Sequence, residues 1–283
     1  MTPFLAGLGA ALAWTATTLC SSASSRRIGP IPTLAWVMLF GILVAAPFAI
    51  AAGRPPGLDG SSLAWLAVVG TTNVAGLALL YTALRRGRVG VVASVASTQG
   101  AIAALLAIAT GERPGAVTIV GFAPVVLGVV LVTYETRESH DDPGDPLGTT
   151  VGLAAGAATL FAVGLFAAGQ ASQDVPIGWV ALPARVVGVV VLLGALAAGM
   201  RPLVRIPKAY LAIATGLFEV VGILCFAYGA REGIAVTSVV SSQFAALSVV
   251  GAFFLFRERL MRRQVVGVAI LAVGVAMVAV GGA

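Results

Sequence analysis

The chain has 283 residues, of which 59% are hydrophobic and only 10% are charged, and its mean hydropathy is +1.03. Soluble domains average about 25% charged residues, so this composition excludes an ordinary soluble protein and indicates one embedded in lipid. The net charge of +6, carried by sixteen Arg and one Lys, is then best explained by charges that orient membrane spans and meet anionic headgroups, not by nucleic acid.

Ten apolar runs follow one another along the chain. A helix needs about 20 residues to cross roughly 30 Å of hydrocarbon. Runs of that length lie approximately at 3–24, 32–52, 62–84, 89–110 and 115–134, then at 148–169, 176–199, 209–230, 234–256 and 264–281. They are too long for barrel strands, and lipid cannot satisfy free backbone groups, so each predicts a transmembrane helix. The first run has no basic segment before it, which favours a span over a cleaved signal peptide.

Part of the sequence occurs twice. Seven residues recur with an offset of 144: Ala83, Val92, Ser94, Val95, Ser97, Gln99 and Ala101 return as Ala227, Val236, Ser238, Val239, Ser241, Gln243 and Ala245. Further on the offset becomes 146: Glu112-Arg113, Gly121 and Gly128 return as Glu258-Arg259, Gly267 and Gly274. The chain is therefore a duplicated membrane domain.

The number of spans in each copy predicts how the copies are oriented. We expect a first repeat at 1–134, an acidic linker at 135–147 and a second repeat at 148–283. Five spans is an odd number, so the second repeat must insert upside down relative to the first. The predicted fold is an all-α integral membrane protein of ten transmembrane helices in two inverted five-helix repeats. Such internal symmetry is typical of secondary transporters.

The duplicated stretches resemble the EamA domain of the drug/metabolite transporter superfamily. The first reads Ala83-Leu84-Arg85-Arg86-Gly87 through Gly111-Glu112-Arg113 to Gly121, and the second reads Ala227 through Arg257-Glu258-Arg259-Leu260 to Gln264 and Gly267. Two such units cover essentially the whole chain. The resemblance implies ten spans, cytoplasmic termini and transport of a small molecule.

Two features depart from the pattern of that family. The family often has a Pro midway along spans 4 and 9, where it breaks the helix, but this chain has Gln99 and Gln243 there. The family also often has an Arg in spans 2 and 7. Arg185 fits the second copy, whereas span 2 offers only Trp36 and Met38.

Two ionisable residues lie deep inside spans. Burying such a group costs about 2.5–3.5 kcal/mol on insertion scales, so each is a functional candidate. Glu219 is near the middle of span 8 and Arg185 is inside span 7. These spans are antiparallel neighbours, and the two residues have similar depth, so an ion pair is possible. The pair could be structural, or Arg185 could attract an anionic group while Glu219 exchanges a proton or binds a cationic one.

Other polar residues within spans are further candidates for a transport site. The duplicated Gln99 and Gln243 follow Ser97-Thr98 and Ser241-Ser242, and repeat symmetry would place them at similar depth, where midplane sites form. Interhelical hydrogen bonds are the alternative role. The secondary candidates, some of which could instead be interface anchors, are Asn73, Trp14, Tyr81 and Tyr228.

The remaining features favour structural roles. Gly121, Gly128, Gly267 and Gly274 predict tight packing of spans 5 and 10. Glu112 and Glu258 predict ion pairs with the adjacent arginines at the headgroups, with a gating role as the alternative. Cys20 and Cys225 are read as small hydrophobic residues, and His140 as part of a solvated linker. We expect neither a metal nor a cofactor.

Orientation is left open by two arguments that disagree. Odd-numbered loops hold thirteen basic residues: Arg26, Arg27, Arg85, Arg86, Arg88, Arg137, Arg201, Arg205, Lys208, Arg257, Arg259, Arg262 and Arg263. Even-numbered loops hold three: Arg54, Arg113 and Arg231. The positive-inside rule then places both termini outside, whereas the resemblance implies that both are in the cytoplasm.

The hypothesis that accounts for most of these features is a secondary active transporter. It would export small organic metabolites or drugs across the cytoplasmic membrane by alternating access, with proton coupling as an option, as a monomer or homodimer. No P-loop is present, so ATP is not the direct energy source. A magnesium-type channel or carrier is the alternative. An intramembrane enzyme is disfavoured because the spans hold no His and no HExxH motif.

Overall fold

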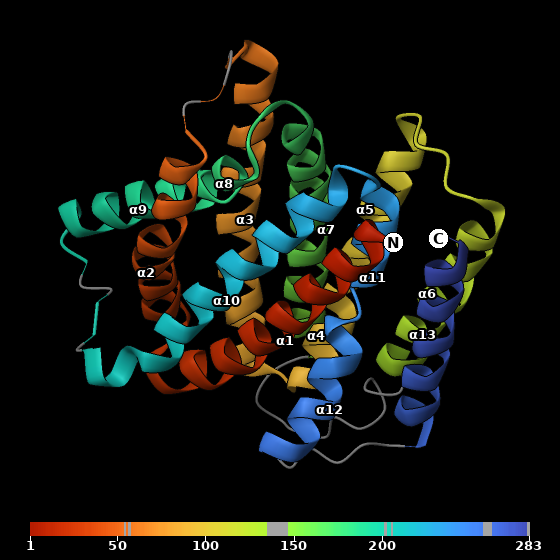
Figure 1. Cartoon of the computed structure of the whole chain (residues 1–283). Helices are drawn as coiled ribbons and strands as arrows, with labels where there is room; N and C mark the ends of the chain where they lie inside the picture. The colour runs from red at the N-terminus through yellow and green to blue at the C-terminus, as the bar shows by residue number, and fades with distance from the viewer. Residues whose placement is uncertain are drawn as a thin grey trace.

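The structure is a computed structural model that describes residues 1–53, 55, 58–134, 147–200, 203–204, 206–256 and 262–281. Every regular element within these residues is a helix (Figure 1). In chain order the helices are α1 (Thr2–Ile28), α2 (Pro30–Ala51), α3 (Gly60–Arg86), α4 (Val89–Ala96), α5 (Thr98–Ala109), α6 (Ala116–Tyr134), α7 (Leu147–Asp174), α8 (Ile177–Val180), α9 (Leu182–Ala197), α10 (Ile206–Ala230), α11 (Ile234–Ser241), α12 (Phe244–Phe256) and α13 (Arg262–Gly281).

These helices match the ten predicted spans in order. Eight spans are long and apolar enough to cross a membrane, with α4–α5, α8–α9 and α11–α12 each counted as one span. The other two, α6 and α13, contain shorter apolar stretches at Ile119–Gly128 and Val265–Gly274. The chain is therefore an all-α membrane protein, as its composition predicts. The linker with His140, and the Glu258-Arg259 pair, lie outside the described residues.

Span 4, made of α4 and α5, and span 9, made of α11 and α12, are each interrupted, although neither contains a proline. In span 4 the backbone N–H of Gly100 donates a hydrogen bond to the carbonyl of Ser97, three residues earlier. In span 9 the backbone N–H of Gln243 donates in the same way to the carbonyl of Val240. Hydroxyls accompany both interruptions: Ser97 Oγ donates to the Ser94 carbonyl and Ser242 Oγ to the Val239 carbonyl. Ser and Thr side chains that bond backbone carbonyls in this way bend helices. The substitution of Gln for Pro therefore does not remove the break.

Contacts between helix ends show that the second repeat is inverted. Arg26 Nε, at the end of span 1, donates to the carbonyl of Leu84, at the end of span 3. Gln173 Nε2, 147 residues after Arg26, donates to the carbonyl of Ala230, 146 residues after Leu84. The two contacts are equivalent in the repeats. Because Leu84 ends the third crossing and Ala230 the eighth, they lie on opposite faces of the membrane.

Close approaches at glycines show the same pseudo-two-fold relation inside the bundle. A Cβ on Gly222 of α10 would lie 2.3 Å from Nε1 of Trp14 on α1, and one on Gly76 of α3 would lie 2.7 Å from Cε1 of Phe161 on α7. Gly76 and Gly222 are equivalent in the two repeats at an offset of 146, and Trp14 and Phe161 are equivalent at an offset of 147. Glycine lets the backbone come this close, as is typical of packed membrane helices. The first helix of each repeat therefore packs against the third helix of the other.

Helices α6 and α13 pack together at the glycines that the sequence singles out. A Cβ on Gly274 would lie 2.8 Å from the Val125 backbone nitrogen and 3.1 Å from the Gly121 carbonyl oxygen. Figure 1 shows the two helices side by side at the edge of the bundle. The spacing of glycines thus predicts this contact correctly.

Glu112 joins the two repeats at one face of the membrane. Its carboxylate accepts hydrogen bonds from the backbone N–H groups of Ile234 and Ala235, at 3.1 to 3.2 Å, and so caps the start of α11. Burial raises the pKa of this carboxyl group, and the two backbone donors oppose the rise. The sequence predicts an ion pair with Arg113 at the headgroups. The structure shows a helix cap instead, because the first N–H groups of a helix lack partners within it.

Replacing Glu112 with Ala should destabilise the protein by about 1 kcal/mol, since two N–H groups at the start of α11 lose their cap. Thermal unfolding of the purified protein in detergent measures this loss. Glu232→Ala is the matched control, because Glu232 is an exposed carboxylate near the same helix end. Equal unfolding temperatures for the two variants would show that the cap does not contribute.

Candidate functional site

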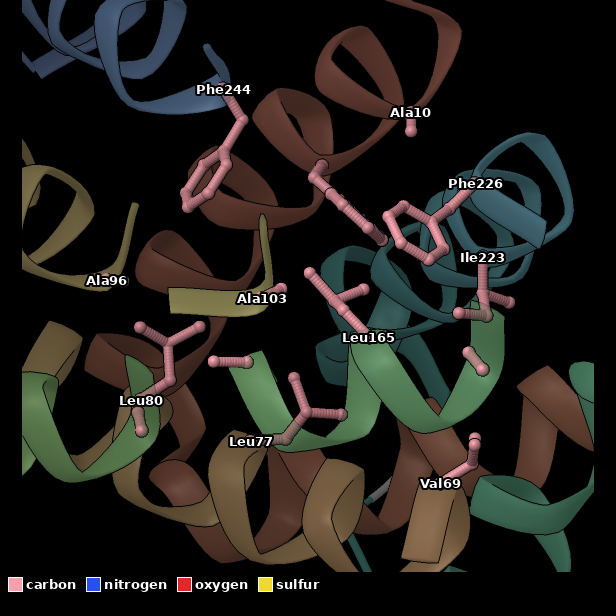
Figure 2. Packing of buried hydrophobic residues seen from close by; sticks show 14 of the residues in the cluster. Ala10, Val69, Leu77, Leu80, Ala96, Ala103, Leu165, Ile223, Phe226 and Phe244 are labelled. Atoms are coloured by element: carbon pink, nitrogen blue, oxygen red, sulfur yellow. The ribbon is translucent and has the colours of Figure 1, made fainter. Parts of the chain in front are cut away.

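A cavity lies at the seam between the two repeats. The empty space in the cavity and at its open mouth together is about 590 Å³, and the lining comes from both repeats. The lining residues are Trp14, Thr17, Thr18, Val69, Asn73, Leu77, Leu80, Ala96, Gln99, Phe161, Gly164, Leu165, Glu219, Ile223 and Phe244. Figure 2 shows Leu77, Leu165, Ile223 and Phe244 converging on this region from α3, α7, α10 and α12. An apolar lining with a few polar groups is typical of small-molecule sites.

The cavity is at mid-depth in the membrane. Gln99 is ten residues from each end of the span Val89–Ala109, and Glu219 is thirteen residues after Ile206 and eleven before Ala230. Gln99 lies immediately beyond the interruption between α4 and α5, and Phe244 lies immediately beyond the one between α11 and α12. Interrupted helices around a midplane cavity are a recurrent arrangement in secondary transporters.

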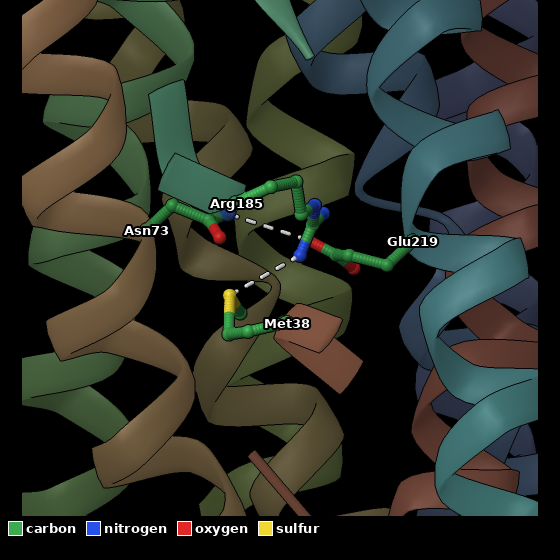
Figure 3. A network of polar contacts seen from close by, with 4 residues as sticks. All are labelled: Met38, Asn73, Arg185 and Glu219. Atoms are coloured by element: carbon green, nitrogen blue, oxygen red, sulfur yellow. Dashed lines mark hydrogen bonds and ion pairs between the residues drawn. The ribbon is translucent and has the colours of Figure 1, made fainter. Parts of the chain in front are cut away.

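The two buried charges meet beside the cavity. Nη2 of Arg185 is 3.7 Å from Oε1 of Glu219, so the ion pair that their similar depths make possible is formed (Figure 3). Asn73 Nδ2 donates to the same Glu219 oxygen at 3.2 Å, and Arg185 Nη1 donates to the Met38 sulfur at 3.7 Å. Glu219 lines the cavity, whereas Arg185 lies behind it with 1% of its surface exposed.

The cluster consists of Met38, Asn73, Arg185 and Glu219. These four residues form two pairs, and the members of each pair occupy equivalent positions in the two repeats. With an offset of 146, Gly70, Asn73, Val74 and Gly76 correspond to Gly216, Glu219, Val220 and Gly222. With an offset of 147, Met38 and Gly41 correspond to Arg185 and Gly188. A Cβ on Gly41 would touch Arg185, and one on Gly188 would touch Met38, as the symmetry requires. Since Asn73 contacts Glu219 and Met38 contacts Arg185, the pseudo-two-fold axis passes through the cluster.

The other candidates from the sequence are divided between the cavity and the surrounding packing. Trp14 and Gln99 line the cavity, but Gln243 is not among its lining residues. On that side the Phe244 ring forms the wall, where the first repeat has Gly100. Ser97, Ser241 and Gln243 are buried at the helix interruptions, and Tyr81 is buried with 0% exposed. Tyr228 is 56% exposed and lies outside the cavity.

Several lining residues are absent from the sequence candidates. Thr17, Thr18, Phe161 and Phe244 carry no charge and do not interrupt their apolar runs. The offset of 147 from Trp14 to Phe161 is the one signal that could have identified any of them. Within the described residues, His, Cys, Asp and Glu form no group of three that could hold a metal ion. Cys20 and Cys225 are free thiols in half-buried positions.

A protein-family model matches this chain in sequence, and a solved structure matches it in fold. The sequence model of the EamA-like transporter family matches residues 1–134 and 148–280. No curated protein matches the sequence. One solved structure, titled only as the crystal structure of a protein, has a TM-score of 0.76 over 99% of this chain and 98% of its own, with 18% sequence identity. At that identity the likeness shows the fold alone.

Proposed function

This chain belongs to the EamA-like transporter family, and we propose that it is a secondary active transporter that exports small organic metabolites or drugs by alternating access. The central cavity would be the substrate site. The single observation that carries the proposal is the position of this cavity, at mid-depth and at the seam of two inverted repeats. Exchange of the conformations of two inverted repeats would open such a site to each face in turn.

The lining supports an organic substrate over a hydrated ion. Nine of its fifteen residues are Val, Leu, Ile, Ala, Phe or Trp, and Glu219 is the one ionisable side chain among the described lining residues. Mg²⁺ binding normally needs several oxygen ligands or retained waters. Both repeats of a single chain build the cavity, so one copy would be sufficient for transport.

Proton coupling through Glu219 makes a direct prediction. In vesicles with an imposed pH gradient, the wild-type protein should accumulate its substrate, whereas Glu219→Gln should only equilibrate it, because the amide cannot exchange a proton. The measurement is the ratio of internal to external substrate at steady state. Glu232→Gln, at an exposed carboxylate outside the cavity, is the control and should accumulate substrate normally.

Accumulation by Glu219→Gln at the wild-type ratio would remove Glu219 as the coupling group and leave the family assignment intact. Electrogenic, salt-dependent flux of Mg²⁺ with no transport of organic compounds would favour the magnesium-type alternative. Both results come from the same vesicle preparation.

A further inference from the structure

Three of the residues that line the cavity have a buried oxygen without a hydrogen-bond partner. Asn73 uses its Nδ2 to donate to Glu219, and this leaves its buried Oδ1 without a partner. The buried oxygens Gln99 Oε1 and Thr17 Oγ1 also have no hydrogen-bond partner. All three belong to lining residues. A buried acceptor without a donor costs about 1–3 kcal/mol, so a ligand that brings donors would relieve this cost.

The carboxylate of Glu219 retains unused capacity to accept hydrogen bonds. Its nearest Arg185 nitrogen is 3.7 Å away, whereas a charge-assisted hydrogen bond has a length of about 2.7–2.9 Å. A carboxylate has about four lone-pair sites, and Asn73 occupies one of them. Because Glu219 lines the cavity and Arg185 lies behind it, the negative end of the ion pair faces a bound ligand.

Aromatic rings complete the lining. Trp14, Phe161 and Phe244 reach the cavity from α1, α7 and α12. The face of an aromatic ring attracts a cation, and this attraction increases when water is excluded. Trp14 and Phe161 are equivalent in the two repeats, so aromatic surface is present on both sides of the pseudo-two-fold axis. These rings favour a ligand with an apolar body and a positive charge.

We propose that the cavity binds a protonated organic amine, whose N–H groups donate to Glu219, Asn73 and Gln99 while its apolar body packs against the aromatic rings. This proposal rests on the transporter function above and narrows its substrate to one chemical class. Arg185 repels part of the added charge, so hydrogen bonds and ring contacts supply much of the selectivity. The N–H donors distinguish such an amine from a quaternary ammonium ion, which has none.

Four ligands of similar size and different charge test the proposal. They are 2-phenylethylamine, its N,N,N-trimethyl derivative, 2-phenylethanol and 3-phenylpropanoate, and binding to the purified wild-type protein is measured by the change in tryptophan fluorescence at pH 7. The amine should bind most tightly and the trimethyl derivative more weakly. The alcohol and the carboxylate should be weaker still, by about tenfold or more, which is the factor expected for loss of one charged hydrogen bond.

Variants then assign the selectivity to particular residues. Glu219→Gln should reduce amine affinity by about tenfold or more and change alcohol affinity little, and Gln99→Leu should reduce the preference of the protein for the amine over the trimethyl derivative. Glu232→Gln is the matched control and should bind as wild type. If Glu219→Gln does not fold, the ranking of the four ligands by the wild-type protein still decides the question.

Two failures can be told apart. If the carboxylate or the alcohol binds best, or if Glu219→Gln binds the amine as wild type does, the amine assignment is wrong and the transporter proposal stands. If none of the four ligands binds and vesicles show no flux of any organic compound, both the amine assignment and the proposed function are contradicted.

Discussion

Replacing Glu219 with Asn should destabilise the protein more than replacing Arg185 with Met. The first change leaves a buried guanidinium without its carboxylate, and Arg does not lose its proton in proteins. The second leaves a buried carboxylate that keeps its hydrogen bond from Asn73 Nδ2. Breaking a buried pair from one side costs about 3–5 kcal/mol. We therefore expect Glu219→Asn near the upper end of this range and Arg185→Met below it, measured by thermal unfolding in detergent.

The double variant Arg185→Met/Glu219→Asn should recover most of the lost stability. It gives the second repeat the residues that the first repeat has at equivalent positions, Met38 and Asn73, and two facing Asn side chains can hydrogen-bond to each other. Arg85→Met, at an exposed arginine, is the control and should unfold as wild type. If the double variant is as unstable as the sum of the single variants, the cluster is not a symmetric contact of equivalent residues.

Replacing Gly100 with Ala should destabilise the crossing of the two interrupted helices. The new Cβ would lie 2.4 Å from the carbonyl oxygen of Ser238 and 2.6 Å from the Cβ of Ser242. The first of these atoms is backbone, so the helices must separate to make room. Overpacking costs about 1–3 kcal/mol and occasionally more, and the higher helix propensity of Ala returns at most about 1 kcal/mol. We expect a net loss of about 2 kcal/mol or more, or failure to fold.

Gly194→Ala is the matched control for this prediction. A Cβ at Gly194, on α9, meets no atom within 4 Å, so the change should leave stability unchanged or raise it slightly. The readouts are the unfolding temperature in detergent and the yield of monodisperse protein. Equal behaviour of the two Gly→Ala variants would mean that the helices do not cross as closely as the structure shows.

The spans and the duplication could be predicted from sequence because both signals are local and repeated. Hydropathy identified the runs, and the odd number of spans in each copy implied the inversion. The offset between equivalent residues of the two repeats was harder to assign where the repeats differ at many positions. Matching Ala83 with Ala227 gives 144, but the contacts of Gly76 and Gly222 show that 146 applies along α3 and α10. Contacts between helices, which the sequence does not record, were needed to set this register.

The site could be predicted only in part because a residue type does not reveal which way its side chain faces. Glu219 and Asn73 were identified by the cost of burying polar groups in lipid. Tyr228 is nine residues after Glu219, which at 100° per residue places it on the opposite side of α10, and it is indeed exposed. The breaks at Ser97 and Ser242 depend on hydroxyl contacts with the backbone. A search for a helix-breaking Pro in spans 4 and 9 could not reveal them.

Thiol labelling at position 99, from each face of the membrane, tests most directly whether the central cavity is an alternating-access site. Gln99→Cys would be made in a background without Cys20 and Cys225, in sealed vesicles treated with a charged methanethiosulfonate on one side at a time. Val191→Cys is the control, because Val191 lies on the outer surface of α9 with 55% of its surface exposed. A Cys at this position should react from neither side, since thiolates form in water and not in lipid. We predict that Cys at position 99 reacts from both faces. Reaction from one face only, or from neither, would contradict the account.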